Sequence, residues 1–91
     1  MAVLVTITNR GGSLAFYDQA APNLIPVLKT QPGFRLHTAH QAGDGGDLVV
    51  TEVWDSRDQH QEWFDTHVRP NIPPDIQQQV QYADLHSVVT P

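Results

Sequence analysis

The chain has 91 residues, a net charge of −5 and no cysteine. This length fits one domain spanning residues 1–91, and without cysteine neither disulfides nor thiolate–metal sites can stabilise it. Its basic residues are scattered, so they form no stripe that could neutralise a nucleic acid or an anionic membrane surface; they are Arg10, Lys29, Arg35, Arg57 and Arg69. We therefore predict neither a nucleic-acid partner nor a membrane partner.

The N-terminal segment predicts a strand and not a targeting signal. Residues 3–8 alternate in polarity and are rich in Val, Ile and Thr, as strands are. The segment has no basic leader followed by a long apolar core, and no apolar run reaches the roughly 20 residues of a membrane span. We therefore expect a cytoplasmic protein.

A helix is predicted after the turn at residues 9–12. Ser13 is a suitable N-cap. Apolar side chains then follow at helical spacings of three and four, namely Leu14, Tyr17, Ala21, Leu24 and Leu28. Pro22 and Pro26 lack the amide hydrogen that a helix interior needs. We therefore expect the helix to kink or break near residues 20–22, or to restart with Pro22 in its first turn.

Two strands joined by a glycine-rich hairpin at residues 42–47 come next. In the first, residues 34–41, alternation places Phe34 opposite to Arg35 and His37, which share a face. The second, residues 47–54, is apolar on both parities, which is typical of a strand covered on both sides.

The second helix is predicted at residues 57–68. Ser56 and Gln59 have the spacing of a capping box, in which each side chain bonds the other residue's backbone amide. Trp63, Phe64, His67 and Val68 fall on one helical face. Residues 69–74 form a proline-rich connector, residues 75–79 are expected to form one helical turn, and residues 81–90 are predicted as the last strand.

The resulting order is strand, helix, strand, strand, helix, strand. It predicts an α+β, ferredoxin-like βαββαβ fold with a four-stranded antiparallel sheet and both helices on one face. Because the strand at residues 47–54 is apolar on both sides, the other face also needs cover. A second copy of the chain packed sheet to sheet is the simplest cover, so we predict a homodimer.

Three features carry a resemblance to a known family. They are the Gly-Phe pair at residues 33–34, the glycine-rich hairpin, and the run Val-Trp-Asp-Ser-Arg-Asp at residues 53–58 that ends a strand and starts a helix. Over residues 3–70 the chain resembles the antibiotic biosynthesis monooxygenase (ABM) domain of the dimeric α/β-barrel superfamily. The resemblance implies a dimeric α/β barrel with a ligand cavity between sheet and helices in each subunit.

The resemblance also bears on cofactors. Family members include cofactor-independent oxygenases of phenolic polyketides, quinol oxygenases and haem-degrading oxygenases. The haem-degrading branch uses a first-strand asparagine, a second-helix tryptophan and a later haem-binding histidine. Trp63 matches the tryptophan, but Ile7 stands near the asparagine position, with Asn9 close by, and no histidine follows the second helix before Pro73 and Pro74. We therefore predict no cofactor.

The five histidines do not form a metal site at the spacings that the sequence gives. His37 and His40 face opposite sides of a strand, and His60 and His67 are separated by about 10 Å along one helix. We therefore predict no metal. His60 is expected at a helix edge and His86 on a strand surface.

Candidate catalytic residues are His37, His67 and Trp63. His37 lies mid-strand, where its ring either serves as an acid or base toward a phenol or quinol, or is satisfied by its neighbours. His67 points inward with Trp63 on the helical face. Trp63 either stacks on a flat ligand or belongs to the core.

Candidate substrate-binding residues are Tyr17, Arg35, Glu52, Trp54 and Phe64. Tyr17 offers a hydroxyl, and the aromatic rings offer flat walls for a hydrophobic aromatic ligand. Glu52 either faces solvent at the dimer rim, pairs with Arg35, or serves as a base with a raised pKa in a cavity.

Three functions follow as hypotheses. The first is a cofactor-independent monooxygenase acting on an aromatic, polyketide or quinol-type small molecule. The second is a non-catalytic dimeric module that binds or presents such a ligand. The third is a polyketide cyclase or isomerase on the same fold.

Overall fold

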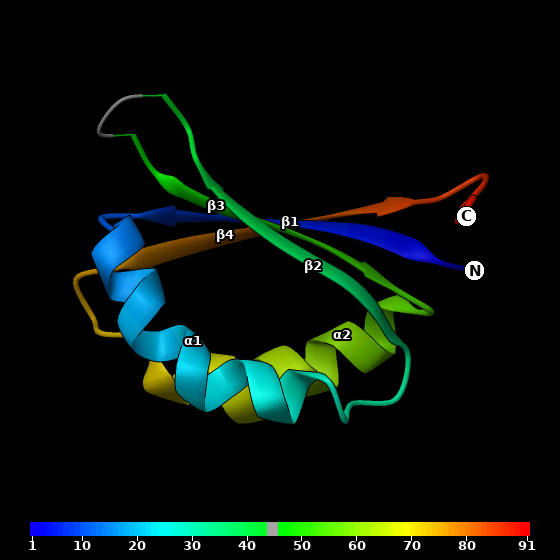
Figure 1. Ribbon diagram of the computed structural model, residues 1–91, viewed down its shortest axis with the longest axis horizontal. Helices are drawn as coiled ribbons and strands as arrows, with labels where there is room; N and C mark the ends of the chain where they lie inside the picture. Colours follow the sequence, from blue (N-terminus) through cyan, green and yellow to red (C-terminus); the bar gives the residue numbers. More distant parts are fainter. Residues whose placement is uncertain (44–45) are drawn as a thin grey trace.

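A four-stranded antiparallel sheet carries both helices on one face (Figure 1). The computed structural model describes residues 1–43 and 46–91. The elements are β1 (Val3–Arg10), α1 (Leu14–Leu28), β2 (Phe34–Gln41), β3 (Leu48–Trp54), α2 (Arg57–Trp63) and β4 (Gln77–Asp84). The strands lie in the order β2-β3-β1-β4. The predicted α+β, ferredoxin-like βαββαβ fold is therefore confirmed, whereas part of the predicted hairpin, residues 44–45, lies outside the described residues.

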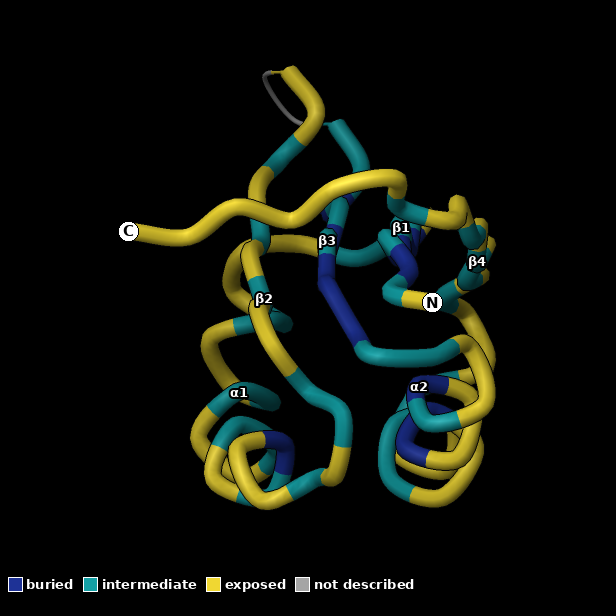
Figure 2. The backbone as a smooth tube through the Cα atoms, turned by 90° about the vertical axis from the view of Figure 1, so that its right-hand side faces the viewer, coloured by how far each residue is buried: buried dark blue, intermediate teal, exposed yellow. Residues whose placement is uncertain are grey.

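The core lies between the inner face of the sheet and the two helices. β1 and β3 contribute alternate buried residues because their register pairs Val3 with Trp54 and Ile7 with Val50. Figure 2 shows the buried backbone concentrated in β1, β3 and α2. The opposite face carries no helix from the described part of the chain (Figure 1). No described helix is long and apolar enough to cross a membrane.

Helix α1 is continuous, so the predicted break near residues 20–22 is wrong. Ser13 caps it by accepting a hydrogen bond from the amide of Phe16 at 3.1 Å. Pro22 and Pro26 lie inside the helix but are both exposed and four residues apart, on one face. The carbonyl groups that lose their partners at this face can bond to water, and the buried face keeps its packing.

Strand β2 contains an irregularity that changes which side chains face the helices. Its register to β3 shifts between Phe34 and Leu36. Phe34 therefore packs against the core beside Trp54, and Arg35 is exposed. The predicted alternation is wrong here, because the extra residue at a β-bulge turns the side chains before it to the opposite face of the sheet.

The second helix begins as predicted and ends differently. Ser56 accepts the amide of Gln59 at 3.2 Å, but the Gln59 side chain accepts the Ser56 hydroxyl and does not bond the Ser56 amide. The α-helix ends at Trp63 and continues as a π-helical turn, Phe64–Val68, followed by a 3-10 turn, Arg69–Asn71. Pro70 lies in this last turn, where its missing amide hydrogen removes one backbone hydrogen bond.

The last strand also differs from its prediction. β4 spans Gln77–Asp84, and neither the helical turn expected at residues 75–79 nor a strand reaching residue 90 is found. Gln77 pairs with Arg10 at the far end of β1, and the amide of Leu85 bonds the carbonyl of Ala2 at 2.8 Å. Pairing with β1 therefore sets the limits of β4, which local polarity does not reveal.

The cap of α2 gives a prediction on stability. Replacing Ser56 by alanine leaves the amide of Gln59 without its side-chain acceptor, and the unfolding free energy should fall by about 1 kcal/mol. Urea unfolding followed by circular dichroism measures this loss. Ser87→Ala, in the exposed C-terminal segment, is the matched control and should change nothing; equal losses in both variants would exclude the capping role.

The fully buried His60 gives a prediction on pH. Burial lowers the pKa of His60 below its ordinary value of 6.5, against the opposing effects of Glu52 and Asp65. The unfolded chain therefore binds a proton at this residue at a higher pH than the folded chain. The free energy of unfolding should therefore fall as the pH drops below 6.5. His60 contributes at most about 1.4 kcal/mol per pH unit to this fall, which ends at the pKa of His60 in the folded protein. Urea unfolding at several pH values tests this, and His60→Gln should flatten the curve in that range; identical curves would exclude it.

Candidate functional site

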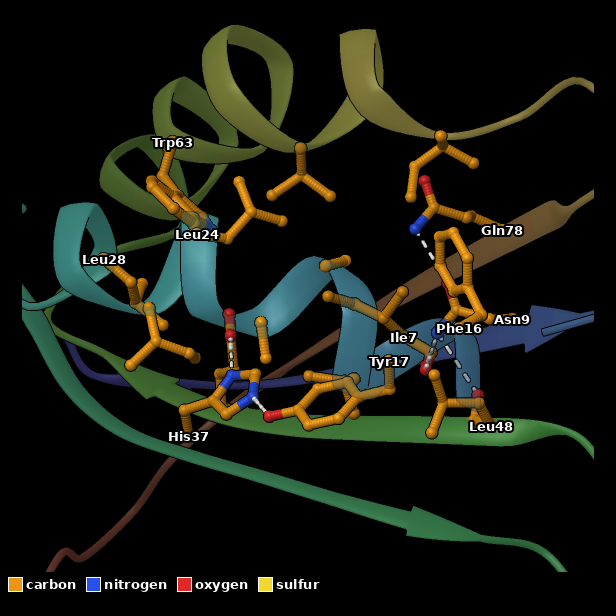
Figure 3. A pocket seen from close by; sticks show the side chains of 17 residues that line it. Ile7, Asn9, Phe16, Tyr17, Leu24, Leu28, His37, Leu48, Trp63 and Gln78 are labelled. Carbon is orange, nitrogen blue, oxygen red and sulfur yellow. Dashed lines mark hydrogen bonds and ion pairs between the residues drawn. The ribbon is translucent and has the colours of Figure 1, made fainter. Parts of the chain in front are cut away.

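A pocket lies between α1, the inner face of the sheet and the segment after α2 (Figure 3). Most of its lining is aliphatic or aromatic, including Leu24, Leu28 and Trp63. Its polar lining residues are Asn9, Tyr17, His37, Glu52 and Gln78. They form two groups, one at each end of the pocket.

The first polar group is a hydrogen-bonded chain from α1 through β2 to β3. The hydroxyl of Tyr17 lies 2.8 Å from Nε2 of His37, and Nδ1 of His37 lies 2.5 Å from Oε2 of Glu52 (Figure 3). The rings of Tyr17 and His37 are nearly parallel, with centroids 5.9 Å apart. An ionised carboxylate can only accept, so Nδ1 carries a hydrogen; in the singly protonated ring Nε2 then accepts from the hydroxyl of Tyr17. His37 therefore presents a lone pair toward the pocket.

Glu52 is the centre of this group. It is 2% exposed and faces His37 on the neighbouring strand, because the two residues are register partners. Its Oε1 accepts the indole N–H of Trp54 at 3.0 Å, and Nε2 of His60 lies 3.5 Å away. No arginine or lysine within residues 1–43 and 46–91 pairs with it. Nitrogen atoms of histidine and tryptophan side chains thus surround a carboxylate that is removed from water.

Tyr17 is held in its protonated form. Burial raises the pKa of Tyr17 above its ordinary value, and the negative charges of Glu52 and Asp18 raise it further. A hydroxyl with a raised pKa stays a donor near neutral pH. This agrees with its bond to the lone pair of His37.

The second polar group consists of two amides at the other end of the pocket. Asn9 is 4% exposed, and its side-chain NH₂ donates to the backbone carbonyls of Ile7 and Leu48 at 3.4 and 3.2 Å. Its oxygen accepts from Nε2 of Gln78 at 2.8 Å. The two backbone acceptors fix the orientation of Asn9, which then fixes that of Gln78.

Four of the predicted site residues lie in the pocket wall: His37, Trp63, Tyr17 and Glu52. The other four lie elsewhere. His67 stacks on the ring of Trp63 at 5.0 Å, and Phe64 is buried in the core. Trp54 lies beneath Glu52 and reaches the site only through its indole N–H. Their roles in function remain predictions.

Arg35 does not share the face of His37. Its guanidinium bonds both carboxylate oxygens of Asp55, at 2.7 and 3.1 Å, on the exposed surface. The bulge in β2 explains this, because it turns Arg35 outward while His37 stays inward. The predicted alternative that Glu52 pairs with Arg35 is therefore wrong, as is the expectation that Glu52 faces solvent.

Three residues at or beside the site were not predicted: Asn9, Gln78 and His60. Asn9 continues the inward alternation of Val3, Val5 and Ile7, so its inward orientation could have been predicted from the sequence. His60 lies three and four residues before Trp63 and Phe64 on the buried helical face, so the expectation of a helix edge is wrong. Gln78 could not be placed, because residues 75–79 were expected to be helical.

Among the residues that the structure describes, no group of three potential metal ligands comes together. The polar groups at the pocket are instead arranged to exchange hydrogen bonds and protons. His37 with Glu52 has the geometry of a general base with an orienting carboxylate.

Solved structures with the same fold include several oxygenases. SnoaB from Streptomyces nogalater, described as a cofactor-independent oxygenase, has 16% identity and a TM-score of 0.61, with 99% of this chain and 96% of that chain covered. The monooxygenase ActVA-Orf6 of Streptomyces coelicolor, solved with nanaomycin D, has 16% identity and a TM-score of 0.66, covering 99% and 91%. The heme-degrader MhuD of Mycobacterium tuberculosis, solved with two hemes, has 16% identity and a TM-score of 0.66, covering 99% and 100%. At these identities the likeness concerns the fold alone.

The family comparison is more specific than these structural likenesses. A search of curated proteins by sequence gave no match. The family model described as antibiotic biosynthesis monooxygenase matches residues 1–78, which include all the polar residues of the pocket. The chain belongs to the antibiotic biosynthesis monooxygenase family.

Proposed function

We propose that this protein is a cofactor-independent monooxygenase acting on an electron-rich aromatic small molecule of the phenolic polyketide or hydroquinone type. The observation that carries the proposal is the chain from Tyr17 through His37 to Glu52 in the wall of an apolar pocket. Family membership and the oxygenases with the same fold support the reaction type.

His37 is the proposed base. Its Nε2 accepts a hydrogen bond from Tyr17 in the free protein, so a substrate hydroxyl or an acidic C–H group can take the place of that donor. Glu52 holds the opposite nitrogen and stabilises the positive charge that His37 gains with the substrate proton. The apolar surroundings strengthen this charge–charge interaction, because little water screens it.

The reaction needs only molecular oxygen as the co-reactant. With an anthrone as substrate, His37 removes a proton from the activated CH₂ group, and the resulting carbanion transfers one electron to oxygen. The substrate radical and superoxide combine to a peroxide anion, which takes the proton back from His37. Loss of the second C–H proton with cleavage of the O–O bond releases water and leaves a carbonyl group. One CH₂ group and one O₂ thus give one C=O group and one H₂O.

Tyr17 and Trp63 have supporting roles in this proposal. Once displaced from His37, the protonated hydroxyl of Tyr17 can donate to an oxygen of the substrate or of the peroxide. The indole of Trp63 offers a flat wall for an aromatic ring. The amides of Asn9 and Gln78 can bond a polar group at the other end of the ligand.

Haem fits the donor groups of this pocket poorly. His37 is the histidine in its lining, and both of its ring nitrogens are engaged, one by Tyr17 and one by Glu52. An axial bond to iron would replace the Tyr17 hydrogen bond. The proposed chemistry uses no haem.

We further propose that the working form is a homodimer. The face of the sheet opposite the helices carries apolar side chains that include Leu36, Val49 and Val53. Leu36 is 50% exposed in the single chain. Burying such a face against a second copy removes apolar surface from water, which is favourable.

The base gives a prediction on activity. His37→Ala should lower oxygen uptake with an anthrone or a hydroquinone by at least about a hundredfold, because the substrate then loses its proton acceptor. An oxygen electrode with product identification measures this. His86→Ala, at an exposed position, is the matched control and should keep full activity.

Two other outcomes would change the assigned function. Ligand binding without consumption, in wild type and His37→Ala alike, would contradict the proposal and favour a non-catalytic ligand-binding module. Conversion of the ligand without oxygen uptake would favour a cyclase or isomerase that uses the same base.

The dimer gives a separate prediction. Sedimentation of the wild type should give about twice the chain mass of 10.1 kDa. Leu36→Glu places a charge on the open sheet face and should give monomers. Leu14→Glu is a matched control, because Leu14 is 46% exposed but lies on α1 in the other layer. A monomeric wild type, or equal behaviour of both variants, would contradict the proposed interface.

A further inference from the structure

His60 is a buried polar side chain outside the pocket lining. Its ring is fully buried on α2, and its Nε2 has no hydrogen-bond partner among the residues that the structure describes. Its Nδ1 lies 2.8 Å from the hydroxyl of Tyr82. Nε2 lies 3.5 Å from Oε1 of Glu52, which is longer than an ordinary N–H···O hydrogen bond. A buried ring nitrogen without a close partner costs free energy, so this arrangement requires an explanation.

The residues around His60 lie in one row across the sheet. His37 is the register partner of Glu52, Glu52 is that of Val5, and Val5 is that of Tyr82. Valine offers no side-chain hydrogen bond, so the polar row is interrupted at β1. His60 comes from α2 and lies near both Glu52 and Tyr82, which joins the two polar parts of the row.

The surroundings of His60 select one tautomer. Burial lowers the pKa of His60, so its ring carries a single proton near neutral pH. If that proton were on Nδ1, the lone pair of Nε2 would face the carboxylate of Glu52, and the two would repel. With the proton on Nε2, a hydrogen and not a lone pair lies on the nitrogen nearest Glu52, and Nδ1 accepts from the hydroxyl of Tyr82. Burial raises the pKa of Tyr82, which keeps its hydroxyl a donor.

We infer that His60 is a positioning residue that fixes the carboxylate of Glu52 and, through it, the tautomer of His37. Nε2 of His60, at 3.5 Å, and the indole N–H of Trp54, which donates at 3.0 Å, are both next to Oε1. Oε2 is then left for Nδ1–H of His37, and the lone pair of His37 Nε2 is kept toward the pocket. The catalytic consequence rests on the proposed function, whereas the effect on the tautomer does not.

The other charged groups near His60 lie around this row and not within it. Asp65, on the π-helical turn, raises the pKa of His60 against the effect of burial. The guanidinium of Arg57 lies over the ring of Tyr82 at 4.5 Å, and that of Arg69 lies over Phe64 at 5.2 Å. Both cations are therefore placed on rings that pack against His60. Glu52 remains the charge that His60 faces directly.

Two substitutions at position 60 separate hydrogen bonding from packing. His60→Gln keeps one donor and one acceptor, whereas His60→Leu removes both and keeps an apolar side chain of similar size. Tyr82→Phe removes only the hydroxyl that bonds His60. His86→Leu is the control at an exposed histidine. The first readout is the protonation of the His37 ring nitrogens in the ligand-free protein, by nitrogen-15 NMR. The second is kcat and KM for oxidation of an anthrone.

We expect the wild type, His60→Gln and His86→Leu to show His37 with its proton on Nδ1. In His60→Leu, and to a smaller extent in Tyr82→Phe, His37 should become a mixture of both tautomers. The kcat of His60→Leu should fall on the order of tenfold with little change in KM, as for other residues that orient a functional histidine. His60→Gln should restore kcat to within about twofold of the wild type.

The inference is overturned if His37 keeps one tautomer in both His60→Leu and Tyr82→Phe, or if His60→Gln is as impaired as His60→Leu. Thermal melts identify variants that do not fold, and Tyr82→Phe, which deletes a single oxygen, still decides the question if His60→Leu is unstable. If His37→Ala oxidises the anthrone normally, the proposed function fails, but the tautomer comparison needs no substrate and still decides the role of His60.

Discussion

The buried carboxylate of Glu52 places the strictest demand on this fold. Removing an ionised carboxylate from water costs several kcal/mol unless other groups replace its hydration. Here the replacements are the N–H groups of His37 on β2 and Trp54 on β3, and Nε2 of His60 on α2 lies 3.5 Å away. The register of two strands and the docking of one helix must all be correct for the charge to be satisfied. The packing of the inner layer and the chemistry of the pocket therefore depend on the same contacts.

The bulge in β2 shows how closely register and site are connected. A strand that slips by one residue turns every side chain to the opposite face. With the bulge at Arg35, Phe34 reaches the core beside Trp54 while His37 stays opposite Glu52. Without it, one of these two contacts would be lost. The irregularity therefore allows β2 to place Phe34 in the core at its start and His37 in the pocket wall at its centre.

The sequence predicts the order of elements and the helix starts, because capping serines and hydrophobic periodicity are local signals. It also carries the inward parity of Glu52, which follows from Leu48, Val50 and Trp54. It does not reveal that His37 and His60 approach this carboxylate from other elements, since tertiary packing alone brings them together. The limits of β4 were missed for the same reason. Local glutamines carry little pattern, and pairing with β1 decides where the strand lies.

The hydrogen bond between Tyr17 and His37 is a contact within the protein that a ligand can replace. In the free protein the hydroxyl of Tyr17 satisfies the lone pair of His37, so the base is not left without a partner in an apolar cavity. A ligand hydroxyl that replaces it exchanges one hydrogen bond for another of similar strength, so little free energy opposes the exchange. Tyr17 lies on α1, whereas Glu52 lies on β3, where its two carboxylate oxygens accept from His37 and from Trp54. The hydroxyl of Tyr17 and the carboxylate of Glu52 thus come from different elements, so a ligand that takes the place of Tyr17 leaves the contacts of Glu52 unchanged.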